Sequence, residues 1–341
     1  MNLTDTATPT PTPASVMSPT PAARASRRYA ELLQQWGLLF VLVAAVAFFS
    51  IRLPDTFLQW STFHDMIAGQ APSLVLALAG VLVLVVGEFD LSLGATLGIT
   101  QYIALHVMIT NGVPVLVAML AALLLGGLVG LVNVALIVGA KVNSFIATIG
   151  VQTALIGLTT LVSNGNQPIF ADAPASFTAI GNHQVLTIPL SVWIALLVAG
   201  LLWVMLDYTS FGRTMRATGA NRIAARLSGL RTTRALVVAL LAAGVLAAFA
   251  GLLDAARTGT SDSTSGPMFL LPAYAAAFLG ATGSKASTYS VSGTILAILL
   301  VAVGVTGLQL LGAEAWVTNF FNGAVLLAAV LLSQLARKRS G

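Results

Sequence analysis

The sequence predicts an all-α, polytopic integral membrane protein with about ten transmembrane helices and both termini in the cytoplasm. Three observations predict this class. Of the 341 residues, 57% are hydrophobic and only 8% are charged, whereas soluble domains average about 25% charged. The apolar residues form continuous runs, which excludes the alternating pattern of a membrane β-barrel. Basic residues gather between these runs, at places that agree with a single topology.

Charge-free runs locate the spans, because backbone groups in lipid must bond within a helix and a span needs about 20 apolar residues. The run 91–140 is long enough for two helices and carries a turn signal at Asn111-Gly112-Val113-Pro114. We therefore expect helices near residues 32–51, 66–87, 91–110, 114–138, 143–162, 189–206, 235–256, 270–284, 288–311 and 316–335.

The segment 270–284 is the least regular of these. It contains Pro272, Gly280 and Gly283, and its length corresponds to about 22 Å of helix, less than the ~30 Å hydrocarbon core. Its composition fits a full crossing and a broken or re-entrant helix equally.

Three basic clusters set the orientation, because cytoplasmic loops carry excess Lys and Arg. Arg24, Arg27 and Arg28 precede the first helix, and Arg337, Lys338 and Arg339 end the chain. The segment 207–234 holds Arg213, Arg216, Arg222, Arg226, Arg231 and Arg234. Ten crossings, with 270–284 counted, place all three clusters inside and leave 164–188 outside as a long loop.

We expect the chain to be divided into three parts. Residues 1–30 form a disordered cytoplasmic tail, since Thr, Pro, Ala and Ser bury too little apolar surface to order a chain. Residues 31–336 form the transmembrane domain, with 207–234 as its cytoplasmic loop. Residues 337–341 are a basic cytoplasmic end. The late first apolar run, without a small-residue cleavage site, is not typical of a signal peptide.

Enzyme motifs are absent from the sequence. The chain has no cysteine and only three scattered histidines, and neither a Gly-x-Ser-x-Gly nor a His-Glu-x-x-His motif occurs. The stretch Gly280–Lys285 resembles a phosphate loop only superficially, because Leu279, Ser284 and Ala286 occupy positions that require Gly, Gly and Ser or Thr. We expect no catalytic residue, metal or cofactor in this chain.

Two polar segments are candidate sites. Gly87–Gly94 places Glu88, Asp90 and Ser92 between two apolar runs; intramembrane carboxylates often line pathways, but Asp90 also suits the N-terminus of the next helix. Residues 221–228 have helical character, with Asn221 as N-cap and Gly229 as the stop. This short helix fits a groove in a cytoplasmic partner, or a solvated loop that touches anionic lipid.

Other polar residues lie within or beside apolar helices. Asp254 and Arg257 share a helix face and suit a structural ion pair or a substrate contact. Gly126 and Gly130 suit close helix packing. A further set consists of amides, which join helices and could also line a path for a neutral polyol: Asn133, Asn143, Gln152, Asn164, Gln309, Asn319 and Asn322.

Three stretches carry a family resemblance: GEFDLSLG at 87–94, NSFIATIGVQTALIGLTTLVSNG at 143–165 and GRTMRATGANRIAARLSG at 212–229. The chain resembles the permease subunits of ribose-type (monosaccharide) ABC importers, in a superfamily that also holds branched-chain amino-acid and nucleoside permeases. The resemblance covers about residues 36–335. It departs at Ser144, where the family usually has Pro, and at Gly283–Ala286, where a Gly-Gly pair is common.

The resemblance implies a function in a bacterial inner membrane. This chain would form the pathway for a ribose-like sugar or polyol, with a second permease subunit (a homodimer), a cytoplasmic ATPase that uses ATP and Mg, and a periplasmic sugar-binding protein; membrane lipid would surround it, and no nucleic acid is expected. The ATPase-coupling residues would be Gly219, Asn221, Ala224, Ala225, Arg226, Leu227, Ser228 and Gly229. The pathway candidates are Glu88, Asp90, Ser92, Asn143, Gln152, Asn164 and Asn322.

Alternatives remain open at this stage. Within the importer class, the solute could be a nucleoside, an autoinducer sugar or a branched-chain amino acid. An ion-coupled secondary transporter is the alternative from another class, although such proteins place ionisable residues near the midplane and the acids here lie at run boundaries. The pattern also hints at an inverted repeat, in which the second to fifth helices match the seventh to tenth.

Overall fold

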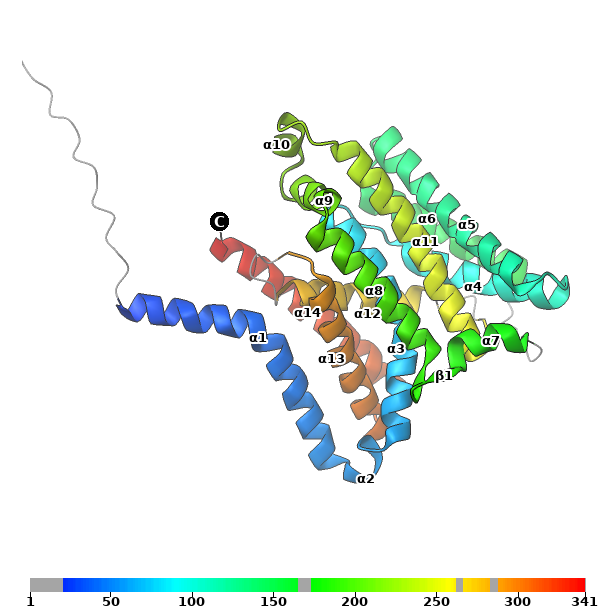
Figure 1. The fold of residues 1–341 in the computed structure, drawn as a ribbon, viewed down its shortest axis with the longest axis horizontal. Helices are drawn as coiled ribbons and strands as arrows, with labels where there is room; N and C mark the ends of the chain where they lie inside the picture. Colours follow the sequence, from blue (N-terminus) through cyan, green and yellow to red (C-terminus); the bar gives the residue numbers. More distant parts are fainter. Residues whose placement is uncertain (1–20, 165–172, 262–265, 283–287, 341) are drawn as a thin grey trace, which may run out of the picture.

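The computed structural model describes residues 21–164, 173–261, 266–282 and 288–340 (Figure 1). Its helices are α1 (Pro21–Arg52), α2 (Pro54–Phe57), α3 (Trp60–Val85), α4 (Ser92–Thr110), α5 (Val115–Val134), α6 (Ser144–Ser163), α7 (Ala175–Asn182), α8 (Leu190–Tyr208), α9 (Ser210–Ala220), α10 (Arg222–Leu227), α11 (Thr232–Thr258), α12 (Gly266–Thr282), α13 (Val291–Leu310) and α14 (Ala315–Ser340). A π-helical turn η1 (Ala135–Gly139) extends α5, and β1 (Gln184–Val185) pairs antiparallel with β2 (Ile188–Pro189).

Each of the ten apolar segments expected from the sequence is a helix. Seven helices are long and apolar enough to cross a membrane, and three shorter apolar helical stretches, 36–52, 266–282 and 316–331, accompany them. The molecule is therefore a polytopic helical membrane protein. Of the uncertain segment 270–284, residues 270–282 belong to one continuous helix, α12, which contains Pro272 and spans 17 residues, and residues 283–284 lie outside the described residues.

The centre of the fold is α3. Its most hydrophobic 18-residue stretch is apolar on every side, and 83% of the residues in that stretch are buried. A helix of that composition must lie inside a bundle or a membrane. It packs against α11, α12, α13 and α8. By contrast, only 28% of the residues are buried in the most hydrophobic stretches of α5 and α8, and only 22% in that of α6. The exposed sides of α5 and α8 are rich in leucine, as is typical of a surface that faces lipid.

Small residues allow the central helices to approach closely. Gly126 of α5 lies against the Gly244 carbonyl of α11, so that a Cβ at either glycine would collide with the opposite backbone. Gly130 lies one turn further along. A Cβ added at this glycine would lie only 2.8 Å from the Leu240 carbonyl oxygen of α11. The small-residue step predicted from the sequence is therefore a packing seam between α5 and α11.

The helix contacts follow the pattern of the inverted repeat. The contacts of α4 with α6 correspond to those of α12 with α14, and the α5–α11 contact corresponds to that of α13 with α3. The first helices of the two halves, α3 and α11, also run in opposite directions. Gln184 bonds to His64 near the start of α3, and the neighbouring Asn182 bonds to the carbonyls of Ala256 and Arg257 near the end of α11.

The structure differs from the expected organisation in three places. Helix α1 begins at Pro21, so residues 21–30 of the expected disordered tail are helical, because Ala, Arg, Glu and Leu dominate the chain from there; residues 1–20 lie outside the described residues. The expected loop 164–188 contains α7 and the β1–β2 hairpin. Residues 210–220, which carried no helix prediction, form α9.

The two ends of the bundle are distinct. In Figure 1, α9 and α10 lie at one end, and α7 with the β1–β2 hairpin lies at the other, with α8 and α11 running between them. The basic end of the chain, 337–341, continues α14 as far as Ser340, and Gly341 lies outside the described residues. The arginine-rich segment and the long hairpin segment are thus on opposite faces.

Candidate functional site

The linker between α3 and α4, residues 86–91, is held by a buried polar network. Asp90 is fully buried and accepts hydrogen bonds from the Ser92 amide (2.9 Å), the Ser92 hydroxyl (2.5 Å) and Asn133 of α5 (3.0 Å). Burial raises the pKa of the Asp90 carboxyl, and these donors partly oppose that shift. The contact with the Ser92 amide is the helix-start role that the sequence allowed for Asp90.

Two other helices hold the backbone of the same linker. Ser144 and Thr148 of α6 accept hydrogen bonds from the amides of Phe89 (3.3 Å) and Leu91 (3.0 Å). Tyr274 of α12 accepts from the Asp90 amide (3.0 Å) and donates to the Asp90 carbonyl (2.8 Å). The hydroxyl of Ser144 therefore accepts a hydrogen bond that a proline, the residue expected here from the resemblance, could not accept.

The arginine-rich segment folds into α9 and α10, which meet the linker from the other side. A Cβ at Gly219 would collide with the Val85 carbonyl at the end of α3 and would lie 3.1 Å from the Gly87 amide. Arg222, the first residue of α10, pairs with Glu88 at 2.5 Å. The structure thus brings together the three stretches on which the family resemblance rests.

Helix α10 has the boundaries that the sequence predicts. The Asn221 side chain accepts from the Ala224 amide at 2.9 Å, and Gly229 has a φ of +77°, which favours glycine after a helix end. Ala225 is buried against the protein. The other predicted coupling residues Ala224, Arg226, Leu227 and Ser228 are exposed. Their contact with a partner remains a prediction.

An apolar ridge on α10 points away from the protein. Ile223 is 75% exposed and Leu227 is 84% exposed, and their spacing of four places them on one face of the helix. Leu227 is among the coupling residues predicted from the sequence, and Ile223 is not. The i, i+4 spacing of two large apolar residues in an otherwise basic loop was the available signal.

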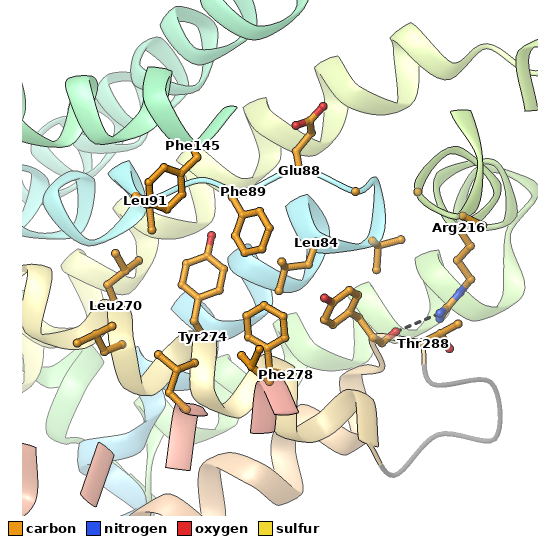
Figure 2. A pocket seen from close by; sticks show the side chains of 18 of the residues that line it. Leu84, Glu88, Phe89, Leu91, Phe145, Arg216, Leu270, Tyr274, Phe278 and Thr288 are labelled. Atoms are coloured by element: carbon orange, nitrogen blue, oxygen red, sulfur yellow. Dashed lines mark hydrogen bonds between the residues drawn. The ribbon is translucent and has the colours of Figure 1, made fainter. Parts of the chain in front are cut away.

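A cavity of about 860 Å³ lies beside the linker. Its walls come from the end of α3, the linker, the start of α6, α9, α12, residues 288–289 and α14. Figure 2 shows Phe89, Tyr274 and Phe278 facing one another in this cavity, with pairwise ring distances of 6.1 to 6.3 Å. The Glu88 carboxylate points away from these rings (Figure 2). This volume suits a small ligand or part of a pathway.

The remaining pathway candidates lie along α6 and α14. Asn143 caps α6 by accepting from the Phe145 amide at 3.0 Å. Gln152 is half-buried on α6, and Asn164 ends this helix in a left-handed conformation, about 30 Å from Asn143 along a 20-residue helix. Asn322 of α14 has a buried Oδ1 without a partner among the described residues. Asn143 therefore lies next to Ser144, which bonds the linker, whereas Gln152 and Asn164 lie progressively farther along α6. Whether these amides line a pathway stays a prediction.

A second buried polar group lies towards the opposite end. Asp254 pairs with Arg257 at 3.3 Å, as the spacing predicts, and accepts from Gln101 of α4 at 2.9 Å. These bonds join α4 to the end of α11. Among the residues that the structure describes, no three His, Asp or Glu side chains gather where they could hold a metal ion.

Comparison with known proteins identifies the family. The model described as "Branched-chain amino acid transport system / permease component" matches residues 65–330. The chain belongs to this family. The ribose import permease protein of Escherichia coli (strain K12) is 31% identical to this permease over 314 residues, which are 90% of this chain and 96% of that protein.

Other relatives agree with this assignment. The ribose import permease protein of Bacillus subtilis (strain 168) is 32% identical over 302 residues, covering 89% of this chain and 91% of that protein. The autoinducer 2 import system permease protein of Escherichia coli O9:H4 (strain HS) is 32% identical over 310 residues, covering 89% and 92%. No solved structure matches. The chain is a multi-pass permease component of the ABC importer class, and not an enzyme.

Proposed function

We propose that this permease forms the pathway for a monosaccharide or similar polyol in an ATP-driven importer of a bacterial inner membrane. Helix α10 docks on a cytoplasmic ATPase that binds ATP and Mg, and a periplasmic binding protein delivers the solute to the opposite face. The observation that carries the proposal is the exposed Ile223–Leu227 ridge on a helix whose first residue is tied to the linker beside the cavity.

The proposed topology has ten crossings, with α10 and both termini inside. The three shorter apolar stretches supply the crossings beyond the seven long spans. The α12 helix measures about 25 Å at 1.5 Å per residue, a few ångströms less than the ~30 Å hydrocarbon core. The arginines around α9 and α10 support a cytoplasmic location for that end, and the α7 segment then faces the periplasm.

A neutral, hydroxylated solute fits the chemistry of the inner cavity. Its wall combines aromatic rings and leucines with a few polar groups, as small-molecule sites usually do. Two of the relatives are named as ribose import permeases and one as an autoinducer 2 permease. A nucleoside or branched-chain amino acid is the alternative cargo. Against an ion-coupled carrier, the buried carboxylate Asp90 already has three hydrogen-bond donors.

A second copy of the chain would complete the pathway along α6. The exposed side of α5 carries Leu120, Leu124 and Leu128, which suit lipid. The exposed side of α6 carries a stripe of Gly150, Thr153, Gly157 and Thr160 beside apolar side chains such as Ile146, Ile149 and Leu161. Small and hydroxylated residues are typical of helix interfaces within membranes, so this face suits a partner helix or a polar path.

Co-purification tests the proposal. The ATPase encoded beside the permease should co-purify with the detergent-solubilised wild type, whereas Leu227→Asp should lose it, because a charge replaces an apolar contact that this chain itself does not use. The matched control is Leu186→Asp. Leu186 is 80% exposed on the hairpin at the other end of the bundle, so its replacement should leave the complex intact.

Two results would contradict the proposal. If the wild type binds no ATPase, the proposal that this permease works in an ATP-driven importer is contradicted. Equal binding by wild type and Leu227→Asp would exclude α10 as the docking element.

A further inference from the structure

We propose that the ion pair between Glu88 and Arg222 transmits the displacement of α10 to the inner cavity. The inference rests on the proposed function, in which α10 receives the ATPase, and it assigns to these two residues a positioning role in coupling. Neither the family model nor the relatives' names assign such a role to either residue.

The geometry of the pair favours a firm connection. The Arg222 guanidinium and the Glu88 carboxylate are 2.5 Å apart, and the Glu88 side chain is only 13% exposed, against 40% for Arg222. A charge-assisted hydrogen bond of this kind is stronger than a neutral one. Partial burial of the carboxylate also limits its screening by salt.

The two residues lie at the ends of two differently supported segments. Arg222 begins α10, whose apolar ridge is free for a partner. Glu88 belongs to the linker, which α5, α6 and α12 hold through Asn133, Ser144, Thr148 and Tyr274. Among the described residues, Glu88 is the linker side chain that bonds to α9 or α10. A displacement of α10 therefore acts on the linker at Glu88.

The linker carries such a displacement directly into the cavity. Phe89 follows Glu88, and its ring lies 6.3 Å from Tyr274 and 6.1 Å from Phe278. The two adjacent side chains point in different directions: Figure 2 shows the Glu88 carboxylate directed away from the rings and the Phe89 ring facing Tyr274 and Phe278. The carboxylate pairs with Arg222 of α10. A movement of the Glu88 backbone must then reposition the Phe89 ring against its two aromatic neighbours.

Steric contact at Gly219 complements the ion pair. The end of α3 touches Gly219 so closely that no Cβ fits there, so α9 can push on the linker but cannot pull on it. An ion pair resists separation and therefore supplies the pull. Together, the steric contact and the ion pair make the linker follow α10 whether α10 moves towards it or away from it.

A charge-swap experiment tests the role of the pair. The permease is reconstituted in proteoliposomes with its ATPase and binding protein, and D-ribose taken up per ATP hydrolysed is measured. Loss of one partner leaves the other charge unpaired, so Glu88→Gln and Arg222→Gln should each lower this ratio about tenfold while the ATPase still co-purifies. The double variant Glu88→Arg/Arg222→Glu should restore most of the ratio.

The matched control is Arg234→Gln. Arg234 lies in the first turn of α11, is exposed, and takes part in none of the ion pairs among the described residues. Its replacement removes the same charge from the same face. The ratio of ribose to ATP should stay at the wild-type value, which separates the effect of the pair from that of net charge.

A covalent tie provides a second measurement that does not depend on the swapped charges. Because the chain has no cysteine, Glu88→Cys/Arg222→Cys introduces the only two thiols. This variant should be uncoupled as purified, and a short bifunctional maleimide that joins the thiols should restore ribose uptake per ATP. A thiol reagent with one reactive group should not restore it.

The outcomes separate this inference from the proposed function. If the single variants bind the ATPase and keep the wild-type ratio of ribose to ATP, the inference is overturned and the importer function stands. The same follows if neither the charge swap nor the covalent tie restores the ratio. If the wild type binds no ATPase, the proposed function itself fails.

Discussion

Asp90 shows how a carboxyl group is accommodated in the core of an apolar protein. Its carboxylate accepts hydrogen bonds from the amide and hydroxyl of Ser92, in its own turn, and from Asn133 of the neighbouring helix α5. Asn133 has a double function, because its amide donates to Asp90 at 3.0 Å and to the Ser92 hydroxyl at 2.9 Å. This amide therefore joins α5 to the start of α4.

Replacement of Asn133 by alanine should destabilise the permease. The change leaves a buried Asp90 oxygen without its donor, which costs about 1–3 kcal/mol in the free energy of unfolding. Thermal unfolding of the detergent-solubilised protein measures the effect. The control Asn319→Ala removes an exposed amide from α14 and should change stability by less than about 0.5 kcal/mol. Equal effects of the two variants would contradict the assignment.

At this scale the sequence predicts local interactions well and distant ones poorly. Asn221 and Gly229 could be assigned from the sequence, because a helix cap depends on residues a few positions apart. The Asp254–Arg257 pair was predicted by spacing in the same way. Nothing local connects Tyr274 with Asp90, or Arg222 with Glu88, since each pair is separated by more than a hundred positions.

At the scale of elements, continuous apolar runs were sufficient to predict the ten apolar helices, seven of them of spanning length. The elements that were missed are short or mixed in composition. Helix α9 contains two arginines and two threonines among its eleven residues, so it lacks an apolar run. Helix α7 and the two-residue strands β1 and β2 are too short to produce a clear period. The cavity between elements could not be predicted, because it depends on how helices cross.

The seam between α5 and α11 yields a prediction about helix packing. Gly126→Val would force a side chain against the Gly244 carbonyl and Ala248, so the helices must separate; overpacking of this kind costs about 1–3 kcal/mol. The adjacent Gly127→Val meets only the end of the Val245 side chain, at 3.6 Å, and serves as control. The midpoint of unfolding in detergent should fall for the first variant alone.

An equal fall for both glycine variants would show that valine is unfavourable throughout this part of α5. The seam would then have no special role. An unchanged midpoint for Gly126→Val would contradict the close approach of the two backbones.

At the scale of the whole molecule, the distribution of charge predicts more than any single motif. The arginine clusters orient the chain, and the fold separates the arginine-rich segment from the hairpin segment in agreement with that orientation (Figure 1). The correspondence between α3–α6 and α11–α14 then makes the linker 86–91 one member of a repeated architecture. This linker meets α10 through the Glu88–Arg222 pair and α9 through the close approach of Gly87 to Gly219.

Uptake of labelled D-ribose by proteoliposomes tests the central claim most directly. The vesicles contain the purified permease and its ATPase, with the binding protein added on the hairpin side. We expect uptake only when ATP is supplied on the α10 side, and a protonophore should have no effect. Uptake by the permease alone along a proton gradient, without ATP or the ATPase, would contradict the claim.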